Sequence, residues 1–119
     1  MARRPVGRQP RPSKAEVAVS RLEAHHLDAL VDDDLLLAPA REFAAQRAGG
    51  EGFALVAVVD AVPVGLLGVH TGEGWQLHGL VVNASMAGQG VEERLVAAAE
   101  ELARPMGSIT GLDGVMHQL

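Results

Sequence analysis

The residues best placed to do chemistry surround two glycines, Gly88 and Gly90, which come just before an expected helix. The first N–H groups of a helix have no partner inside it and carry the positive end of its dipole, so an anion can bind there. Glycine adopts positive φ without strain and lets a phosphate approach the backbone closely. The spacing therefore predicts a phosphate-type anion site at the start of this helix.

Two common phosphate sites are excluded by residues that the chain lacks. A nucleoside-triphosphate loop requires a lysine and a hydroxyl residue after its last glycine, but Gly90 is followed by Val91, and the only lysine is Lys14. A dinucleotide loop requires a third glycine beyond Gly88 and Gly90, followed by a ribose-binding acid on a second strand. The loop fits neither class.

The elements on either side position this loop. Leu77 and the apolar run from Leu80 to Val82 indicate a buried strand, and Gly79 inside it predicts a bulge or a close backbone approach. Residues 91 to 103 have the periodicity of a helix. Its expected apolar face consists of Val91, Leu95, Ala98 and Leu102.

This strand, loop and helix resemble the acyl-CoA loop of the GNAT N-acetyltransferase superfamily, whose signature has the form L-x-V-x-P-x-x-R-G-x-G-I-G. The matching residues here are LVVNASMAGQGVE, from Leu80 to Glu92. The resemblance implies acetyl-CoA as cosubstrate, with its pantetheine arm along the strand and its pyrophosphate on the loop amides. The implied binding positions are Leu80, Val81 and Val82 for the arm, and Ala87, Gly88, Gln89, Gly90, Val91 and Glu92 for the pyrophosphate.

Two positions depart from the family pattern. Ala87 stands where the family has arginine or glutamine, and Glu92 replaces its last small residue. A carboxylate at a helix start is favourable for the dipole alone, but it repels a pyrophosphate bound there. The alternative is that Glu92 and Glu93 are first-turn acids of an ordinary helix.

Length and composition indicate one globular domain of 119 residues with 48% hydrophobic content. Residues 1–14 hold five basic residues and no acid, so we expect a disordered basic tail before a domain at 15–119. Nucleic acid is not an expected partner, because no basic domain follows the tail. The absence of cysteine excludes disulfides and thiolate metal sites, and it fits a cytoplasmic protein. No segment is apolar enough to span a membrane.

The order of expected elements also resembles the GNAT fold over residues 15–113. We expect an α/β fold with a mixed central sheet of about five strands flanked by helices. The expected strands are 16–20, 52–59, 62–70, the strand before the loop, and a parallel strand at 108–113; the helices are 23–37, one with Pro39 in its first turn that ends at Gly49–Gly50, and 91–103.

Family members normally continue with a further helix and two strands, and often use a tyrosine as general acid. This chain ends six residues after 113 and contains no tyrosine, so we expect a domain that lacks the usual C-terminal strands. The strand at 108–113 would then have an unpaired edge. We hypothesise a homodimer formed through that edge.

His78 is the candidate catalytic base, because it lies two residues before Leu80, where the family commonly has a glutamate. An imidazole with a pKa near ~6.5 can accept a proton at neutral pH. The alternative is a histidine that only packs on the strand, and His70 could lie nearby. No metal is expected, because His25 and His26 point to different helix faces without metal-ligand spacing.

The resemblance implies an acyl-CoA-dependent N-acetyltransferase that moves an acetyl group to an amine on a small molecule or a protein. The acidic balance of the domain favours a cationic acceptor. The alternative is a non-catalytic, degenerate GNAT-like domain that binds CoA or a protein partner.

Overall fold

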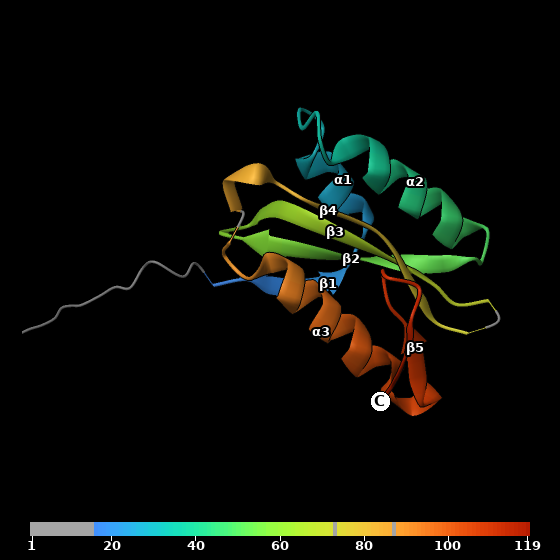
Figure 1. Ribbon diagram of the computed structural model, residues 1–119. Helices are drawn as coiled ribbons and strands as arrows, with labels where there is room; N and C mark the ends of the chain where they lie inside the picture. Colours follow the sequence, from blue (N-terminus) through green and yellow to red (C-terminus); the bar gives the residue numbers. More distant parts are fainter. Residues whose placement is uncertain (1–15, 73, 87) are drawn as a thin grey trace, which may run out of the picture.

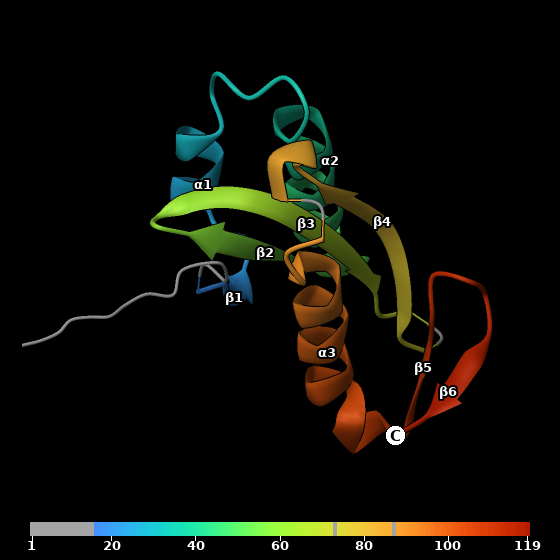
Figure 2. The ribbon, with the colours of Figure 1, turned by 60° about the vertical axis from the view of Figure 1, so that its left-hand side comes forward.

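A computed structural model describes residues 16–72, 74–86 and 88–119, so the predicted tail at 1–14 and the candidate residue Ala87 lie outside the described residues. The chain forms one sheet of six strands in the order β1-β2-β3-β4-β5-β6, with helices on both faces (Figures 1 and 2). The elements are β1 Ala18–Arg21, α1 Ala24–Ala29, α2 Leu37–Ala48, β2 Gly52–Val59, β3 Val62–His70, β4 Gln76–Val82, η2 Ala84–Met86, α3 Val91–Ala103, η3 Arg104–Met106, β5 Ser108–Thr110 and β6 Met116–Gln118. This confirms the predicted α/β fold.

The centre of the sheet is the hairpin of β2 and β3, which confirms the strands predicted at 52–59 and 62–70. Asp60 and Ala61 connect them with φ of 51° and 67°. Two consecutive positive φ values give a tight turn whose twist matches that of the strands. β1 begins two residues later than predicted, and pairs with β2 antiparallel.

The predicted irregularity at Gly79 is present in β4. Leu66 pairs with Val81 and Gly68 pairs with His78, so β4 has two residues opposite the single residue between them on β3. Gly79 has φ +69°, which glycine adopts without strain. The bulge places His78 and Val81, three residues apart, on the same face of the sheet.

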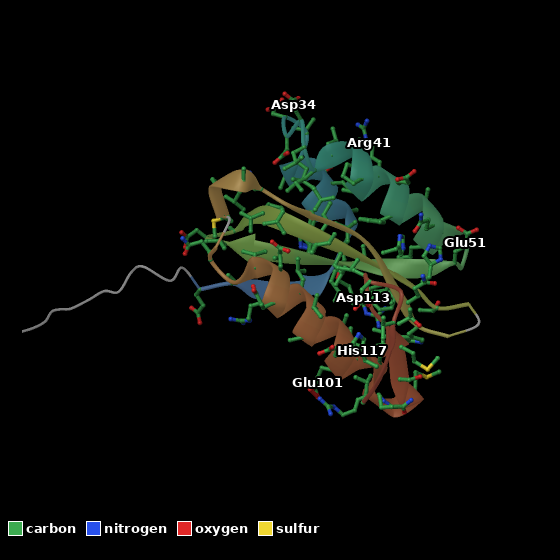
Figure 3. The ribbon with its side chains drawn as sticks, in the orientation of Figure 1. Asp34, Arg41, Glu51, Glu101, Asp113 and His117 are labelled. Atoms are coloured by element: carbon green, nitrogen blue, oxygen red, sulfur yellow. The ribbon has the colours of Figure 1, made fainter. Side chains whose placement is uncertain are left out.

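Two hydrophobic clusters pack on opposite faces of the sheet, while charged side chains such as Asp34, Arg41 and Glu101 point outward (Figure 3). The cluster under α3 includes Leu55, Leu67, Val69, Leu77, Leu95 and Ile109. The cluster under α1 and α2 includes Leu30, Leu36, Phe43, Val56 and Leu66. Aromatic residues make up only 3% of the sequence, so aliphatic side chains form most of both clusters.

The single helix predicted at 23–37 is wrong, because the chain leaves the helix after Ala29. The carboxylate of Asp33 accepts hydrogen bonds from the N–H groups of Leu35 and Leu36 at 2.9 and 2.8 Å. An aspartate bonded to the backbone two and three residues ahead favours a turn over a helix. As a result Leu36 is buried, whereas Val31 is 64% exposed.

The other two helices lie where they were expected. α2 has Pro39 in its first turn, buries Phe43 and ends with Gly49 as its C-cap.

α3 spans the predicted residues 91–103, but a different row of its side chains is buried. Ala99 and Ala103 are buried, while Leu102 is 40% exposed. Small residues face the sheet because α3 lies close to β3 at Gly65, where a Cβ would be 3.0 Å from Val91.

The predicted parallel strand is present as β5, which ends at Thr110 and pairs with β4. Its expected unpaired edge is wrong, because β6 pairs with it antiparallel. Asp113 Oδ1 accepts a hydrogen bond from the Val115 N–H at 2.9 Å, and Gly114 has φ +79°, so the chain turns back sharply. β6 is the outer strand, so the edge of β5 that the homodimer hypothesis requires is already paired.

Among the described residues, no helix has the length and apolarity required to cross a membrane.

Candidate functional site

The loop between β4 and α3 begins with a side-chain turn at Asn83. The Asn83 N–H donates to the Val64 carbonyl at 2.8 Å, which holds the end of β4 against β3. The Asn83 side-chain oxygen accepts hydrogen bonds from the N–H and the hydroxyl of Ser85, each at 2.9 Å. These bonds direct the chain away from the sheet through η2 and toward the two glycines.

Gly88 and Gly90 have φ of +78° and +83°, so both use the conformational freedom that their positions suggested. Gly90 is the N-cap of α3 and forms no side-chain cap. The Arg94 N–H donates to the Gly90 carbonyl at 3.0 Å, which makes the three preceding amides the unpaired first donors of the helix. No acceptor is recorded for the N–H groups of residues 91–93 within the described part of the chain. The start of α3 can therefore receive an anion.

A cavity of about 910 Å³ opens at this end of α3. Its walls are formed by Glu16, Val17, Val82, Met86, Gly88, Gln89, Gly90, Val91, Glu92, Glu93 and Arg94. The Arg94 guanidinium donates to the Val17 carbonyl at 2.8 Å, so it ties β1 to the helix beside the cavity. Three carboxylates and one guanidinium thus surround the helix start, which is unfavourable for an anion compared with a site rich in arginine.

The edge of β4 that faces β5 is open next to this cavity. β4 and β5 pair only at Gln76 and Thr110, and the Thr110 N–H donates to the Trp75 carbonyl at 2.9 Å. Beyond that point the two strands diverge (Figure 2). No β5 partner is recorded for residues 80–82 among the described residues, so the backbone on this edge is available for hydrogen bonds to a ligand.

His78 lies on the opposite face of β4 from Leu77 and α3, between His70 and Phe43. The ring centroids are 3.9 Å apart for His70 and His78, and 5.5 Å apart for Phe43 and His78. The Nε2 atom of His78 is buried without a hydrogen-bond partner among the described residues. It is packed against Gly68, where a Cβ would be only 2.8 Å away. Nδ1 is then the nitrogen through which His78 can reach a ligand.

The surroundings of His78 favour its neutral form. Burial lowers the pKa of His78, the neighbouring His70 lowers it further, and Glu42 partly opposes both effects. Neutral imidazole is the form that can accept a proton. The alternation of β3 and β4 did not reveal this environment, because Phe43 and Glu42 come from α2 and meet His78 only through the tertiary packing.

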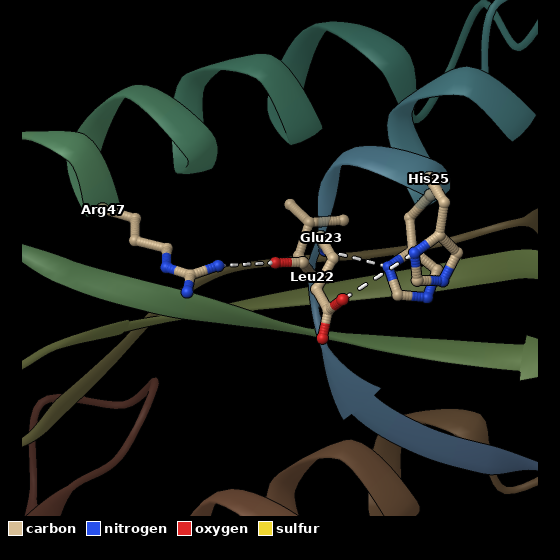
Figure 4. A network of polar contacts seen from close by, with 5 residues as sticks. Leu22, Glu23, His25 and Arg47 are labelled. Atoms are coloured by element: carbon tan, nitrogen blue, oxygen red, sulfur yellow. Dashed lines mark hydrogen bonds and ion pairs between the residues drawn. The ribbon is translucent and has the colours of Figure 1, made fainter.

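The other histidine pair has a structural role. The Glu23 N–H donates to His26 Nδ1 at 2.9 Å, which holds the start of α1 next to the end of β1. Arg47 of α2 donates to the Leu22 carbonyl at 3.3 Å and ties α2 to the same place (Figure 4). His25 lies 3.8 Å from the Glu23 carboxylate. In the described ranges no three metal-binding side chains gather closely enough to hold a metal ion.

Arg104 is remote from the loop. It lies just past the C-terminal end of α3 and donates to the Glu101 carboxylate at 3.0 and 3.3 Å. Arg94, in the first turns of α3, borders the cavity, whereas Arg104 does not.

A model of the Acetyltransferase (GNAT) family matches residues 19–117. No curated protein is similar enough in sequence to count as a match. Solved structures give the fold independently. A GNAT family N-acetyltransferase from Escherichia coli, in complex with CoA, has a TM-score of 0.67 and 20% identity, over 88% of this chain and 66% of that chain.

Two further solved structures share the fold. An acetyltransferase of the family from Brucella melitensis, in complex with acetyl-CoA, has a TM-score of 0.62 and 13% identity, over 82% of this chain and 75% of that chain. The aminoglycoside 6'-N-acetyltransferase from Enterococcus faecium has a TM-score of 0.60 and 25% identity, over 79% of this chain and 59% of that chain. The chain thus spans less than two thirds of the Escherichia coli and Enterococcus faecium proteins.

Proposed function

The chain belongs to the GNAT acetyltransferase family, and from this premise we propose that it transfers an acetyl group from acetyl-CoA to a primary amine on a small molecule or a protein. The observation that supports this most is the uncapped start of α3, which faces a cavity of about 910 Å³ beside the open edge of β4. A phosphate site and an extended backbone edge are what a pyrophosphate joined to an amide-containing arm requires.

In the proposed complex the pyrophosphate accepts hydrogen bonds from the loop and helix amides between residues 87 and 92. The pantetheine arm then runs along Val82, Val81 and Leu80, where its amides pair with the free edge of β4. This direction leads from the helix start toward the bulge at Gly79 and brings the thioester near His78. The CoA-bound structures of the Escherichia coli and Brucella melitensis proteins support acetyl-CoA as the cosubstrate.

The proposed reaction is direct acyl transfer. The amine nitrogen attacks the thioester carbonyl carbon, a C–N bond forms, the C–S bond breaks, and CoA leaves as the thiolate. The amine loses one proton, and His78 is the group proposed to take it through Nδ1. The lowered pKa of His78 keeps the imidazole neutral at pH 7 and ready to do so.

The second candidate is a non-catalytic domain that binds CoA or a protein partner. It is favoured by the carboxylates of Glu16, Glu92 and Glu93 around the cavity, which weaken the attraction for a pyrophosphate. The two candidates differ in turnover and not in fold.

A thermal melt of the full chain tests the proposed cosubstrate. A ligand that binds only the folded state at about 100 times its Kd adds about 2.7 kcal/mol of stability, so acetyl-CoA raises the Tm. S-acetyl-N-acetylcysteamine, which has the thioester but no pyrophosphate, is the control and has a much smaller effect. A cooperative melt that acetyl-CoA does not shift would refute acetyl-CoA binding.

A further inference from the structure

A row of four side chains crosses the sheet on the face turned away from α3. His70 pairs with Gln76 across β3 and β4, Gln76 pairs with Thr110 of β5, and Thr110 pairs with Met116 of β6. Their sequence neighbours Val69, Leu77 and Ile109 all belong to the cluster under α3. Because strand residues alternate between faces, the four side chains of the row share the other face.

A cavity of about 350 Å³ lies over this row. Its lining includes the four residues of the row together with Ser108 and Trp75. The cluster under α1 and α2 draws on β2 and β3, whereas β5 and β6 extend away from both helices (Figure 2). Among the described residues no helix covers the row, and three of its four side chains, all but that of Met116, are polar. The cavity lies at the lower end of the ~300–1,000 Å³ typical of small-molecule sites.

The cavity is linked to His78 through His70. The His70 ring, which lines the cavity, lies 3.9 Å from the His78 ring between centroids. Gln76 precedes His78 by two residues on the same strand and therefore shares its face. A small molecule on the row is thus one side chain, that of His70, away from the imidazole proposed as the base.

The described lining combines neutral hydrogen-bonding side chains with the apolar surface of Trp75 and Met116. Gln76 supplies a carboxamide, Ser108 and Thr110 supply hydroxyls, and His70 supplies an imidazole. No hydrogen bond from these four side chains to another described residue is recorded, so they are available to a ligand. The sequence contains no lysine or arginine between Arg47 and Arg94, or after Arg104, so the segments around the cavity offer no basic side chain to a carboxylate or a phosphate.

We propose that this cavity binds the acceptor, and that the acceptor is a hydroxylated primary amine without an acidic group, such as an amino sugar. Gln76, Ser108 and Thr110 determine this specificity by bonding the hydroxyl groups, and the amine is held at the His78 end. The inference rests on the proposed acetyl transfer for its reaction, but binding at the row can be measured without acetyl-CoA.

Amide chemical shifts of the ¹⁵N-labelled full chain test the site. D-glucosamine is the probe, cyclohexylamine is a six-membered ring amine without hydroxyls, and glucosamine 6-phosphate adds an anion. We expect glucosamine to shift the amides of Gln76, Thr110 and Met116, and to bind at least fivefold more tightly than either comparison compound. Equal or tighter binding of cyclohexylamine or glucosamine 6-phosphate, shifts elsewhere, or no shifts would overturn the inference.

A double variant, Gln76→Leu with Thr110→Val, removes the hydrogen-bonding groups and nearly preserves side-chain size. We expect it to weaken glucosamine binding at least fivefold, while Gln46→Leu on α2 leaves it unchanged. A folded double variant, shown by a cooperative melt, that binds glucosamine like the wild type would contradict the assignment.

A separate titration with acetyl-CoA distinguishes the two proposals. Shifts at residues 80–92 with acetyl-CoA but none at the row with glucosamine overturn the acceptor site alone. Glucosamine binding at the row without any response to acetyl-CoA supports the site and refutes the proposed function.

Discussion

The imidazole rings of His70 and His78 lie 3.9 Å apart between centroids, across the bulged pair of β3 and β4. This contact joins the row of side chains under the small cavity to the imidazole of His78 on β4. It also places the His70 ring where its positive charge lowers the pKa of His78. The proton affinity of His78 thus depends on a residue from the neighbouring strand.

Replacing His70 with asparagine raises the pKa of His78, because it removes the neighbouring ring that can carry positive charge. The pKa remains below the ordinary value near ~6.5, since burial is the larger cause of its depression. An NMR titration of the ring signals measures this. His117→Asn on β6 is the control with no effect on His78, and a pKa of His78 that falls or stays constant in His70→Asn would contradict the account.

His26 makes the stability of the protein dependent on pH. Burial lowers its pKa, His25 lowers it further and Glu23 opposes them, and its Nδ1 must be unprotonated to accept the Glu23 N–H. The unfolded state therefore binds more protons than the folded state between the lowered pKa and ~6.5. The free energy of unfolding then decreases as the pH falls through this window, and His78 contributes in the same direction.

The variant His26→Gln tests this origin, because glutamine at the third helical position can accept the same hydrogen bond without titrating. Urea unfolding between pH 8 and pH 5 is expected to show a smaller loss of stability in the variant than in the wild type. A loss of equal or greater size in the variant would mean that His26 is not the source.

Gly68 has no room for a side chain. A Cβ there would lie 2.6 Å from a carbon of the Phe43 ring, 2.8 Å from His78 Nε2 and 2.8 Å from the His78 carbonyl oxygen, which is part of the backbone. We expect Gly68→Ala to lower the free energy of unfolding by about 1–3 kcal/mol, as overpacking does. Gly72→Ala, where a Cβ meets nothing within 4 Å, is the control and changes stability by less than ~0.5 kcal/mol. Equal denaturant midpoints for the two variants would contradict this packing.

Glu92→Gln separates the two effects of a carboxylate at the start of α3. Its loss weakens the interaction with the helix dipole, so stability falls by about 0.3–1 kcal/mol. The same loss removes repulsion of a bound pyrophosphate, so we expect acetyl-CoA affinity to increase about two- to fivefold, and more at low salt. Calorimetric titration and denaturant unfolding measure the two effects, and Glu101→Gln at the other end of α3 is the control for acetyl-CoA affinity. Weaker acetyl-CoA binding by Glu92→Gln would show that the carboxylate does not face the ligand.

Elements with strong local signals could be predicted from the sequence. The β2–β3 hairpin, the bulge at Gly79 and the bounds of α3 follow from alternation, glycine placement and helical periodicity. The break after Ala29 was missed because one aspartate, Asp33, overrides an apolar pattern that suits a helix. β6 was missed because its three residues are all exposed and so have no apolar alternation.

The candidate site could be predicted only in part. The glycine conformations and the free helix start depend on local sequence, and were expected at Gly88 and Gly90. The burial of His78 against Phe43 depends on how α2 crosses the sheet, and the row from His70 to Met116 depends on the register of four strands. Neither can be derived from spacing within one segment.

The central claim is acetyl transfer, and release of free CoA tests it most directly. Because the chain contains no cysteine, a thiol reagent reports only the CoA that is released. We predict that acetyl-CoA with a hydroxylated primary amine gives thiol release above the rate without amine, and that His78→Ala reduces this rate while the Tm shift with acetyl-CoA persists. Acetyl-CoA that raises the Tm but releases no thiol with any primary amine tested would contradict the enzyme and favour the non-catalytic binding domain.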